Sequence, residues 1–382
     1  MTTTAPTAPA PQAPPTEPRG NRWLPTIRGT MLAANIELHR RRPSRKGWIV
    51  YGVTVGSVIA LAVLISLVAG PGSTTVPLEL NLLMVLGLGV LIGTSLAATS
   101  VNGDSTEGVL APLQMTRLTA GDIALGKLIA SWAVAAIALV TLLPILIYSY
   151  SKAEWGPGQV AGMIATIFFI VLATTAIGLA WSSIAARAIA SVALAHLTVG
   201  ALAIGTLVAF GVLSPLVSES VEVTHRFQDW DQATEEQQND PTFNGEGLPC
   251  KEDTFEEHVV HSEKLAWLLL LNPVIVLGET APVPDRASLE AGEASNGVFS
   301  MIHQSISDAR LGPLMPVNQD FCSNVATNDD QWQERPIEAA TYPGNPWLGL
   351  AAYAGLLIAS LWFTVNRLRV PYRTLRGGTR VA

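Results

Sequence analysis

Residues 158–182, GQVAGMIATIFFIVLATTAIGLAWS, run for 25 residues without a charged side chain. A helix needs about 20 predominantly apolar residues to cross a bilayer. A charge at the bilayer centre costs at least ~2.5–3.5 kcal/mol. This stretch is therefore predicted to cross a membrane as one α-helix.

Five further stretches have the same apolar, nearly charge-free character, and Pro144 is expected to kink one of them. These stretches are 47–69, 79–100, 127–150, 188–215 and 346–366. Only 14% of the chain is charged, against roughly 25% in an average soluble domain. The sequence predicts an all-α polytopic membrane protein with six transmembrane helices, of which the first five occupy residues 47–218.

Acidic residues are concentrated in one polar block, residues 219–345, which holds 23 of the 30 acidic and 6 of the 23 basic residues. The block is predicted to be a large insert between the fifth and sixth spans. An acidic block lacks the clustered Lys and Arg of a nucleic-acid interface, so nucleic acid is excluded as a partner.

Basic residues flank the spans at both ends of the chain. Eight basic and two acidic residues precede the first span, and the tail 367–382 carries five arginines and no acid. The positive-inside rule places both termini in the cytoplasm, which requires an even number of spans and puts residues 219–345 outside. The 14-residue run 265–278, LAWLLLLNPVIVLG, is accordingly predicted to be a re-entrant element, because a seventh crossing would misplace the basic tail.

The segment before the first span divides into two parts. Residues 1–21 are rich in Pro, Thr and Ala and are predicted to be a disordered cytoplasmic tail. Residues 22–46 are predicted to form an amphipathic elbow helix that lies along membrane lipids, although an ordinary surface helix would fit the same pattern. Its apolar face comprises Leu24, Ile27, Met31, Ala34 and Leu38.

Within the acidic block, Cys250 and Cys322 are the only cysteines of the chain. Two cysteines confined to one external domain favour a disulfide in an oxidising compartment, and two free thiols are the alternative. Thr254 and Glu257 have the spacing of a capping box, which predicts a helix running on to Trp267. Residues 298–310 are also predicted to be helical.

Few residues indicate chemistry. His196 is the clearest ionisable group within a span; it is either functional or a histidine bonded to a neighbouring helix. His258 and His261, three apart on the predicted helix, could hold a surface metal, but a solvated acidic face is the simpler reading. No nucleophile–base pattern is present, so we expect neither catalysis nor a cofactor in this chain alone.

The loop 104–120 carries the most informative pattern. It reads Glu107-Gly-Val-Leu-Ala-Pro-Leu-Gln-Met-Thr-Arg-Leu-Thr119, followed by Gly126-Lys127. Residues 121–127 also match GxxxxGK, but Leu128 stands where a phosphate loop needs Ser or Thr, and an apolar run follows. The chain therefore has no ATP site of its own.

The longer pattern resembles the ABC-2 family of ABC-transporter permeases. The matching positions are Glu107, Gly108, Leu110, Leu113, Thr116, Leu118, Thr119, Gly126 and Lys127. Val109 and Arg117 depart from the usual Thr and Pro. The resemblance also covers the elbow, the six spans and the Leu-Asn-Pro element, whereas the acidic insert is larger than the family usually shows.

The resemblance implies a permease subunit of a bacterial plasma-membrane exporter, with ATP and Mg²⁺ bound by separate ABC ATPase subunits and with a second permease subunit. The loop would be the coupling helix on which the ATPase docks; a plain amphipathic linker is the alternative. Two other functions stay open. One is an ABC-type mechanical transmitter that regulates an extracytoplasmic protein through the insert, and the other is an integral membrane enzyme.

Overall fold

The structure is a computed structural model that describes residues 23–68, 75–239, 242–243, 247–291, 297–316, 318, 320–322 and 329–369. The predicted disordered tail 1–21 and residues 370–382 of the predicted basic tail lie outside the described residues. The described chain is mostly helical and contains one two-stranded sheet.

Within the described residues, six helices are long and apolar enough to cross a membrane, which confirms the predicted number of candidate spans. Two of these candidates run through consecutive elements, namely α3 with α4 and α9 with α10. The elements are α2 (Arg45–Val68), α3 (Val76–Ala98) with α4 (Ser100–Thr106), α6 (Ala120–Val140), α8 (Pro157–Ile184), α9 (Ala188–Gly200) with α10 (Thr206–Leu213), and α17 (Pro346–Leu368).

The centre of the bundle is formed by α3, α6 and α8, each of which has half or more of its apolar window buried. Small residues allow the close approach: a Cβ at Gly178 would lie 2.6 Å from the carbonyl oxygen of Thr94, and a Cβ at Gly93 would lie 2.3 Å from Thr175 Oγ1. By contrast, only 6% of the residues in the most apolar stretch of α2 are buried, and only 11% of those in the α9–α10 helix. These two helices therefore present most of their surface to the surroundings of the chain.

Two of the apolar helices are interrupted. The predicted span 127–150 breaks after Val140 and continues as α7 (Leu143–Tyr150), with Pro144 in its first turn, so the predicted kink is confirmed as a helix break. Between α9 and α10 the chain forms a π-helical turn, Ala201–Gly205. A π turn changes the backbone hydrogen-bond pattern and leaves carbonyl groups for other donors.

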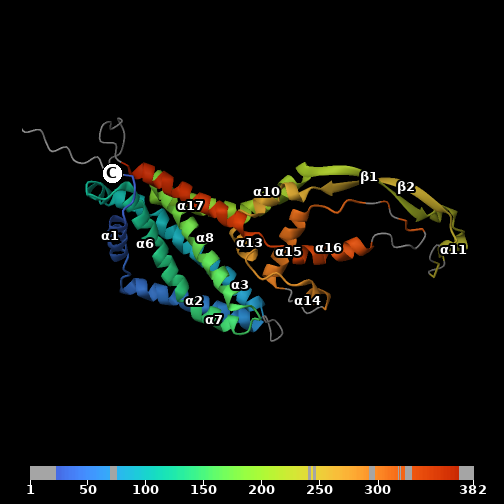
Figure 1. The fold of residues 1–382 in the computed structure, drawn as a ribbon, viewed down its shortest axis with the longest axis horizontal. Helices are drawn as coiled ribbons and strands as arrows, with labels where there is room; N and C mark the ends of the chain where they lie inside the picture. The colour runs from blue at the N-terminus through green and yellow to red at the C-terminus, as the bar shows by residue number, and fades with distance from the viewer. Residues whose placement is uncertain are drawn as a thin grey trace, which may run out of the picture.

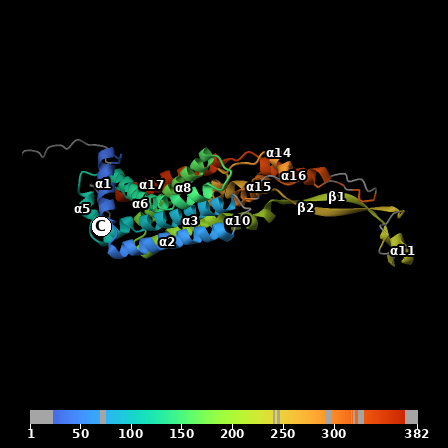
Figure 2. The same cartoon turned by 90° about the horizontal axis from the view of Figure 1, so that it is seen from below.

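The predicted elbow is present as α1 (Ile27–Arg40), which lies across one end of the bundle and packs against α6 (Figures 1 and 2). Thr26 caps it by accepting a hydrogen bond from Gly29 N at 3.1 Å. Its inward residues are Thr30, Ala33, Ala34 and Glu37, whereas Ile27 and Met31 of the predicted apolar face are exposed. The inward face is thus small and polar, and the large apolar side chains point away from the protein.

The insert extends from the opposite end of the bundle and begins with a long antiparallel ribbon (Figure 1). Its strands are β1 (Ser218–Gln228) and β2 (Cys250–Val260). The prediction of an all-α chain is wrong here, as is the helix predicted from Thr254, because Thr254 and Glu257 lie within β2. Val223 and Val259 are buried on one face of the ribbon, and pairing across strands outweighs a local capping pattern.

The rest of the insert is helical. The helix α15 (Val298–Leu311) confirms the predicted helix 298–310, and its first N–H groups, those of Val298 and Phe299, donate to the carboxylate of Glu79 on α3. The remaining described elements are α11 (Glu235–Asn239), α12 (Ala266–Leu269), α13 (Pro273–Gly278), α14 (Arg286–Glu290) and α16 (Asp329–Thr341). The run 265–278 is therefore two short helices joined at Asn272, neither of which is long enough to cross a membrane.

Candidate functional site

A buried ion network joins α1, α4 and α6 at the α1 end of the bundle. The ammonium group of Lys127, whose side chain is 3% exposed, lies 3.1 Å from Glu37 Oε2 and 2.5 Å from Asp104 Oδ2. Arg40 Nη1 contacts Asp104 Oδ1 at 2.7 Å, and Arg41 Nη2 contacts Glu37 Oε1 at 2.8 Å. Each buried charge thus has an oppositely charged partner, as buried ions require.

Glu37 is held in its ionised form by this network. Burial would raise the pKa of Glu37, but the nearby charges of Lys127 and Arg41 outweigh burial, so its pKa lies below the ordinary value. The hydroxyl of Ser100 also donates to Glu37 Oε1 at 3.3 Å. Glu37 therefore remains an anion at neutral pH and binds the elbow to α6.

Residues 121–127, which fit the GxxxxGK pattern, position this network. Gly126 faces α1 so closely that a Cβ would lie 2.5 Å from Ala33 Cβ, and a Cβ at Gly121 would lie 2.5 Å from the carbonyl oxygen of Trp23. Asp122 completes a capping box with Thr119 and also accepts a hydrogen bond from Thr26 N at 2.5 Å. The pattern that resembles a phosphate loop is thus a helix on which the elbow docks.

The predicted coupling helix is reduced to α5 (Leu110–Gln114), a single turn between α4 and α6. Gly108 has a φ of 71°, which lets the chain reverse after α4. Leu110 is buried in an apolar cluster that includes Leu368, and Gln114 Nε2 donates to the carbonyl oxygen of Leu368 at 3.0 Å. The loop is thereby attached to the C-terminal end of α17.

The apolar residues Val109, Leu110 and Leu113 of this loop are only partly exposed. Leu110 and, in part, Leu113 pack inside the chain, so this face is not free for a partner. Val109 and Met115 are exposed instead, Met115 at 84%. Glu107 is exposed too, but its carboxylate pairs with Arg40 Nη2 at 2.8 Å, which links the loop to the ion network.

Two further residues of the pattern that resembles the ABC-2 family make contacts within the chain. Leu118 packs against the same cluster as Leu110, and the exposed Thr116 donates its hydroxyl to the carbonyl oxygen of Leu113 at 2.7 Å. Sequence reasoning missed Glu37, Asp104 and Arg40. A usable signal was present, since Asp104 and Lys127 are isolated charges at the ends of two apolar stretches.

A second junction connects the α9–α10 helix to the run 265–278. Asn272 Nδ2 donates to the carbonyl oxygen of Ala203 at 2.6 Å, within the π turn, and its Oδ1 accepts from Val274 N at 2.9 Å. One side chain therefore caps α13 and also satisfies a carbonyl group of the π turn.

A third cluster lies at the insert end of the bundle, around the fully buried carboxylate of Glu279. Its oxygens accept hydrogen bonds from His303 Nδ1 at 3.0 Å and Asn345 N at 2.7 Å, and Arg310 Nη1 lies 3.3 Å away. His303 Nε2 lies 2.9 Å from the carbonyl oxygen of Tyr342. The imidazole of His303 thus bridges Glu279 and the segment before α17, and Ser307 Oγ also lies 3.4 Å from its Nε2.

The charge state of Glu279 follows from these contacts. Burial would raise its pKa, but the hydrogen bond from His303, the N–H of Asn345 and the charge of Arg310 together hold the pKa below its ordinary value. The cluster thus binds the end of α13, α15 and the segment before α17 to one another.

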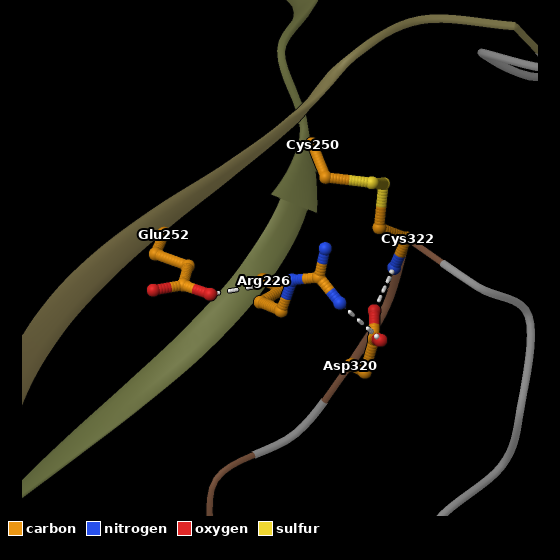
Figure 3. The surroundings of a disulfide bond; sticks show 5 residues. All are labelled: Arg226, Cys250, Glu252, Asp320 and Cys322. Carbon is orange, nitrogen blue, oxygen red and sulfur yellow. Dashed lines mark hydrogen bonds and ion pairs between the residues drawn. A yellow bond between two sulfur atoms is a disulfide. The ribbon is translucent and has the colours of Figure 1, made fainter.

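The predicted disulfide between Cys250 and Cys322 is present and joins β2 to the segment that follows α15 (Figure 3). Beside it, Arg226 lies between Glu252 at 3.4 Å and Asp320 at 3.0 Å. Phe321 N donates to the carbonyl oxygen of Arg226 at 2.9 Å. This segment is therefore held along the outer edge of β1.

The predicted histidine candidates have ordinary partners. His196 Nε2 lies 3.2 Å from Ser95 Oγ on α3, and its Nδ1 lies 2.9 Å from the carbonyl oxygen of Val192. His258 lies in β2, so the helix that was to pair it with His261 is absent, and the described residues contain no group of side chains suited to a metal.

Neither a family of known proteins nor a curated protein matches this chain.

Proposed function

We propose that this chain is the permease subunit of an ATP-binding cassette transporter, with export as its direction. The proposal rests on the resemblance of the loop to the ABC-2 family. The observation that best supports it is that one short loop is bonded to three elements of the bundle. Glu107 pairs with Arg40 of α1, Leu110 packs beside Val101 of α4, and Gln114 bonds to the end of α17.

A force applied to this loop would therefore reach the bundle by two routes. One runs through Glu107 and Arg40 into the network around Lys127, and the other runs through Gln114 into α17. Both routes are short, and the first leads from the exposed Glu107 into the buried network around Lys127. ATP and Mg²⁺ belong to separate ATPase subunits, and the exposed Val109 and Met115 would touch them.

In this proposal the α1 end of the bundle is cytoplasmic, at a bacterial plasma membrane, and the insert is extracytoplasmic. The exposed sides of α2 and the α9–α10 helix would face membrane lipids and a second permease subunit. The basic residues near α1 support this orientation.

Affinity purification of the chain from its own membranes in mild detergent tests the proposal. The wild-type chain is expected to retain an ABC ATPase, identified by mass spectrometry, and Met115→Glu is expected to lose it. Met315→Glu is the matched control, because Met315 is also an exposed methionine but lies in the insert. Absence of an ATPase from all three preparations would overturn the proposal.

A mechanical transmitter is the second candidate, and a specific observation favours it. The α9–α10 helix passes through one short 3-10 turn, Ser214–Val217, directly into β1, and Asn272 bonds its π turn to α13. Movement of this helix would swing the ribbon.

Replacement of residues 225–253 by a four-residue glycine–serine loop, together with Cys322→Ser, would shorten the ribbon while keeping the Thr224–Thr254 pair. Retained export by this variant would exclude the ribbon as the output. Retained ATPase binding with an envelope defect and no measurable export would favour the transmitter over the exporter.

A further inference from the structure

The outer edge of β2 offers unpaired backbone groups. The bonds from His261 N to Val217 O and from Asp229 N to Pro249 O fix which pairs of the antiparallel ribbon are hydrogen-bonded. Because bonded and non-bonded pairs alternate, the pairs Ser220–His258 and Thr224–Thr254 direct their N–H and C=O groups outward. The outward N–H of Thr224 confirms this register, since it donates to Asn318 Oδ1 at 2.9 Å.

The two edges of the ribbon therefore differ. On β1, the outward N–H of Thr224 donates to Asn318, and the outward C=O of Arg226 accepts from Phe321 N. On β2, the outward backbone groups of Thr254, Glu256 and His258 have no partner among the described residues. Among the described residues, nothing would have to be displaced for another strand to pair with the edge of β2.

The free edge opens into a groove of about 490 Å³. Residues 257–260 of β2 line one side, and prolines 313, 316 and 336 with Leu314 line the other. Arg335 also lines it and is held there by Asp308 Oδ1 at 2.6 Å. The groove thus combines a strand edge with a wall that has little capacity to donate backbone hydrogen bonds, because proline has no N–H.

The charge of β2 indicates what kind of strand would fit. Glu252 and Glu256 lie on one face of the strand and Asp253 and Glu257 on the other, because side chains alternate. Opposite charges directly across two strands stabilise their pairing. The whole insert is acidic, with 23 acidic and 6 basic residues in 219–345, which favours the approach of a basic partner.

We propose that the groove along the outer edge of β2 binds an extended, basic segment of another protein on the insert side of the membrane, which adds to the ribbon as a third strand. Main-chain hydrogen bonds to β2 would supply affinity, and the acidic side chains would select lysine and arginine. This interaction goes beyond the transport proposal and does not depend on an ATPase.

The alternative is that the acidic residues only protect an exposed edge from pairing, as charged side chains do on many edge strands. The two accounts differ in what they predict for a basic peptide. A protective edge would reject every added strand, whereas a docking edge would accept a basic one.

The test uses the purified full-length chain in detergent, with its disulfide intact, and a fluorescent eight-residue peptide that alternates lysine and valine. Anisotropy is expected to show saturable binding. The same peptide N-methylated at every amide keeps its charge but cannot pair, and it is expected to bind at least tenfold more weakly. A peptide with glutamate in place of lysine is also expected to lose binding.

Two protein variants provide matched controls, since His258 and Ser220 face each other across the ribbon and both direct their N–H outward. His258→Pro removes a donor from the β2 edge and is expected to weaken binding at least tenfold. Ser220→Pro removes one from the β1 edge and is expected to bind as the wild type does.

Three results would overturn the proposal: no binding of the lysine–valine peptide, equal binding of its N-methylated form, or equal losses in the two proline variants. The N-methylated peptide is measured on the wild-type chain, so the outcome does not depend on the folding of a variant. None of these results bears on the binding of an ATPase at the other end of the molecule.

Discussion

Two buried ion clusters hold the ends of the bundle, and they are built from different chemistry. At the α1 end, Lys127, Arg40 and Arg41 neutralise Glu37 and Asp104. At the insert end, Glu279 pairs with Arg310 and is hydrogen-bonded to His303. The first cluster holds three cations for two carboxylates, whereas the second holds one arginine and one imidazole for a single carboxylate.

The difference indicates a division of labour. The α1 end is a permanent connection between the loop, the elbow and α6, as a transmitter of force requires. At the insert end, one carboxylate joins α13, α15 and the segment before α17. Removing one partner from each cluster in turn tests how much each end depends on its charges.

The largest effect is expected from Lys127→Met, which leaves two buried carboxylates without their shared cation. Removing one partner of a buried ion pair costs about 3–5 kcal/mol. Thermal unfolding of the purified chain, followed by circular dichroism, is expected to shift to markedly lower temperature. Lys152→Met is the control, because Lys152 is exposed. Adding Glu37→Gln to Lys127→Met should recover part of the loss, since one carboxylate then no longer needs a cation.

Loss of the disulfide should act only on the insert. Cys250→Ser with Cys322→Ser removes a link that spans 72 residues, and such links contribute about 2–4 kcal/mol. Hydrogen–deuterium exchange is expected to accelerate in β1 and in residues 318–322, with unchanged protection in α3 and α8. Faster exchange in the bundle would show that the two regions do not unfold separately.

A smaller effect is expected from Glu279→Gln, which weakens charged hydrogen bonds worth about 1.5–3 kcal/mol each. The pKa of Glu279 is lowered by folding, so its contribution is present above the unfolded value of about 4.3 and is lost as the pH falls through the folded pKa. Melting temperatures of wild type and variant should therefore converge in acid and separate as the pH rises toward neutrality. A constant difference at every pH would contradict this assignment.

The smallest effect belongs to Gln114→Ala, which removes one hydrogen bond between the loop and α17. A single hydrogen bond contributes about 0.5–1.5 kcal/mol, so the melting temperature should fall only slightly. If the bond transmits force, ATP hydrolysis by the assembled complex should become less dependent on cargo while stability changes little. Equal responses of hydrolysis to cargo in variant and wild type would remove α17 from the proposed route.

The apolar framework was predictable, because a bilayer demands long charge-free helices and six such stretches stand out. The ribbon was not, since β1 and β2 pair residues as far as 42 positions apart, as in Ser218–Val260, and TFEE has the local pattern of a helix start. The sequence marked Asp104 and Lys127 as isolated charges, but not their pairing with α1, because Glu37 and Lys127 meet only when α1 folds across α6. The disulfide could be predicted because the insert holds just two cysteines.

The most direct test of the central claim is photo-crosslinking at Met115 in native membranes, with benzoylphenylalanine introduced there and, as the control, at Met315. The account predicts that the Met115 position forms an adduct with an ABC ATPase and that the Met315 position does not. An adduct at Met115 that contains no ATPase, or the same ATPase adduct at both positions, would contradict it.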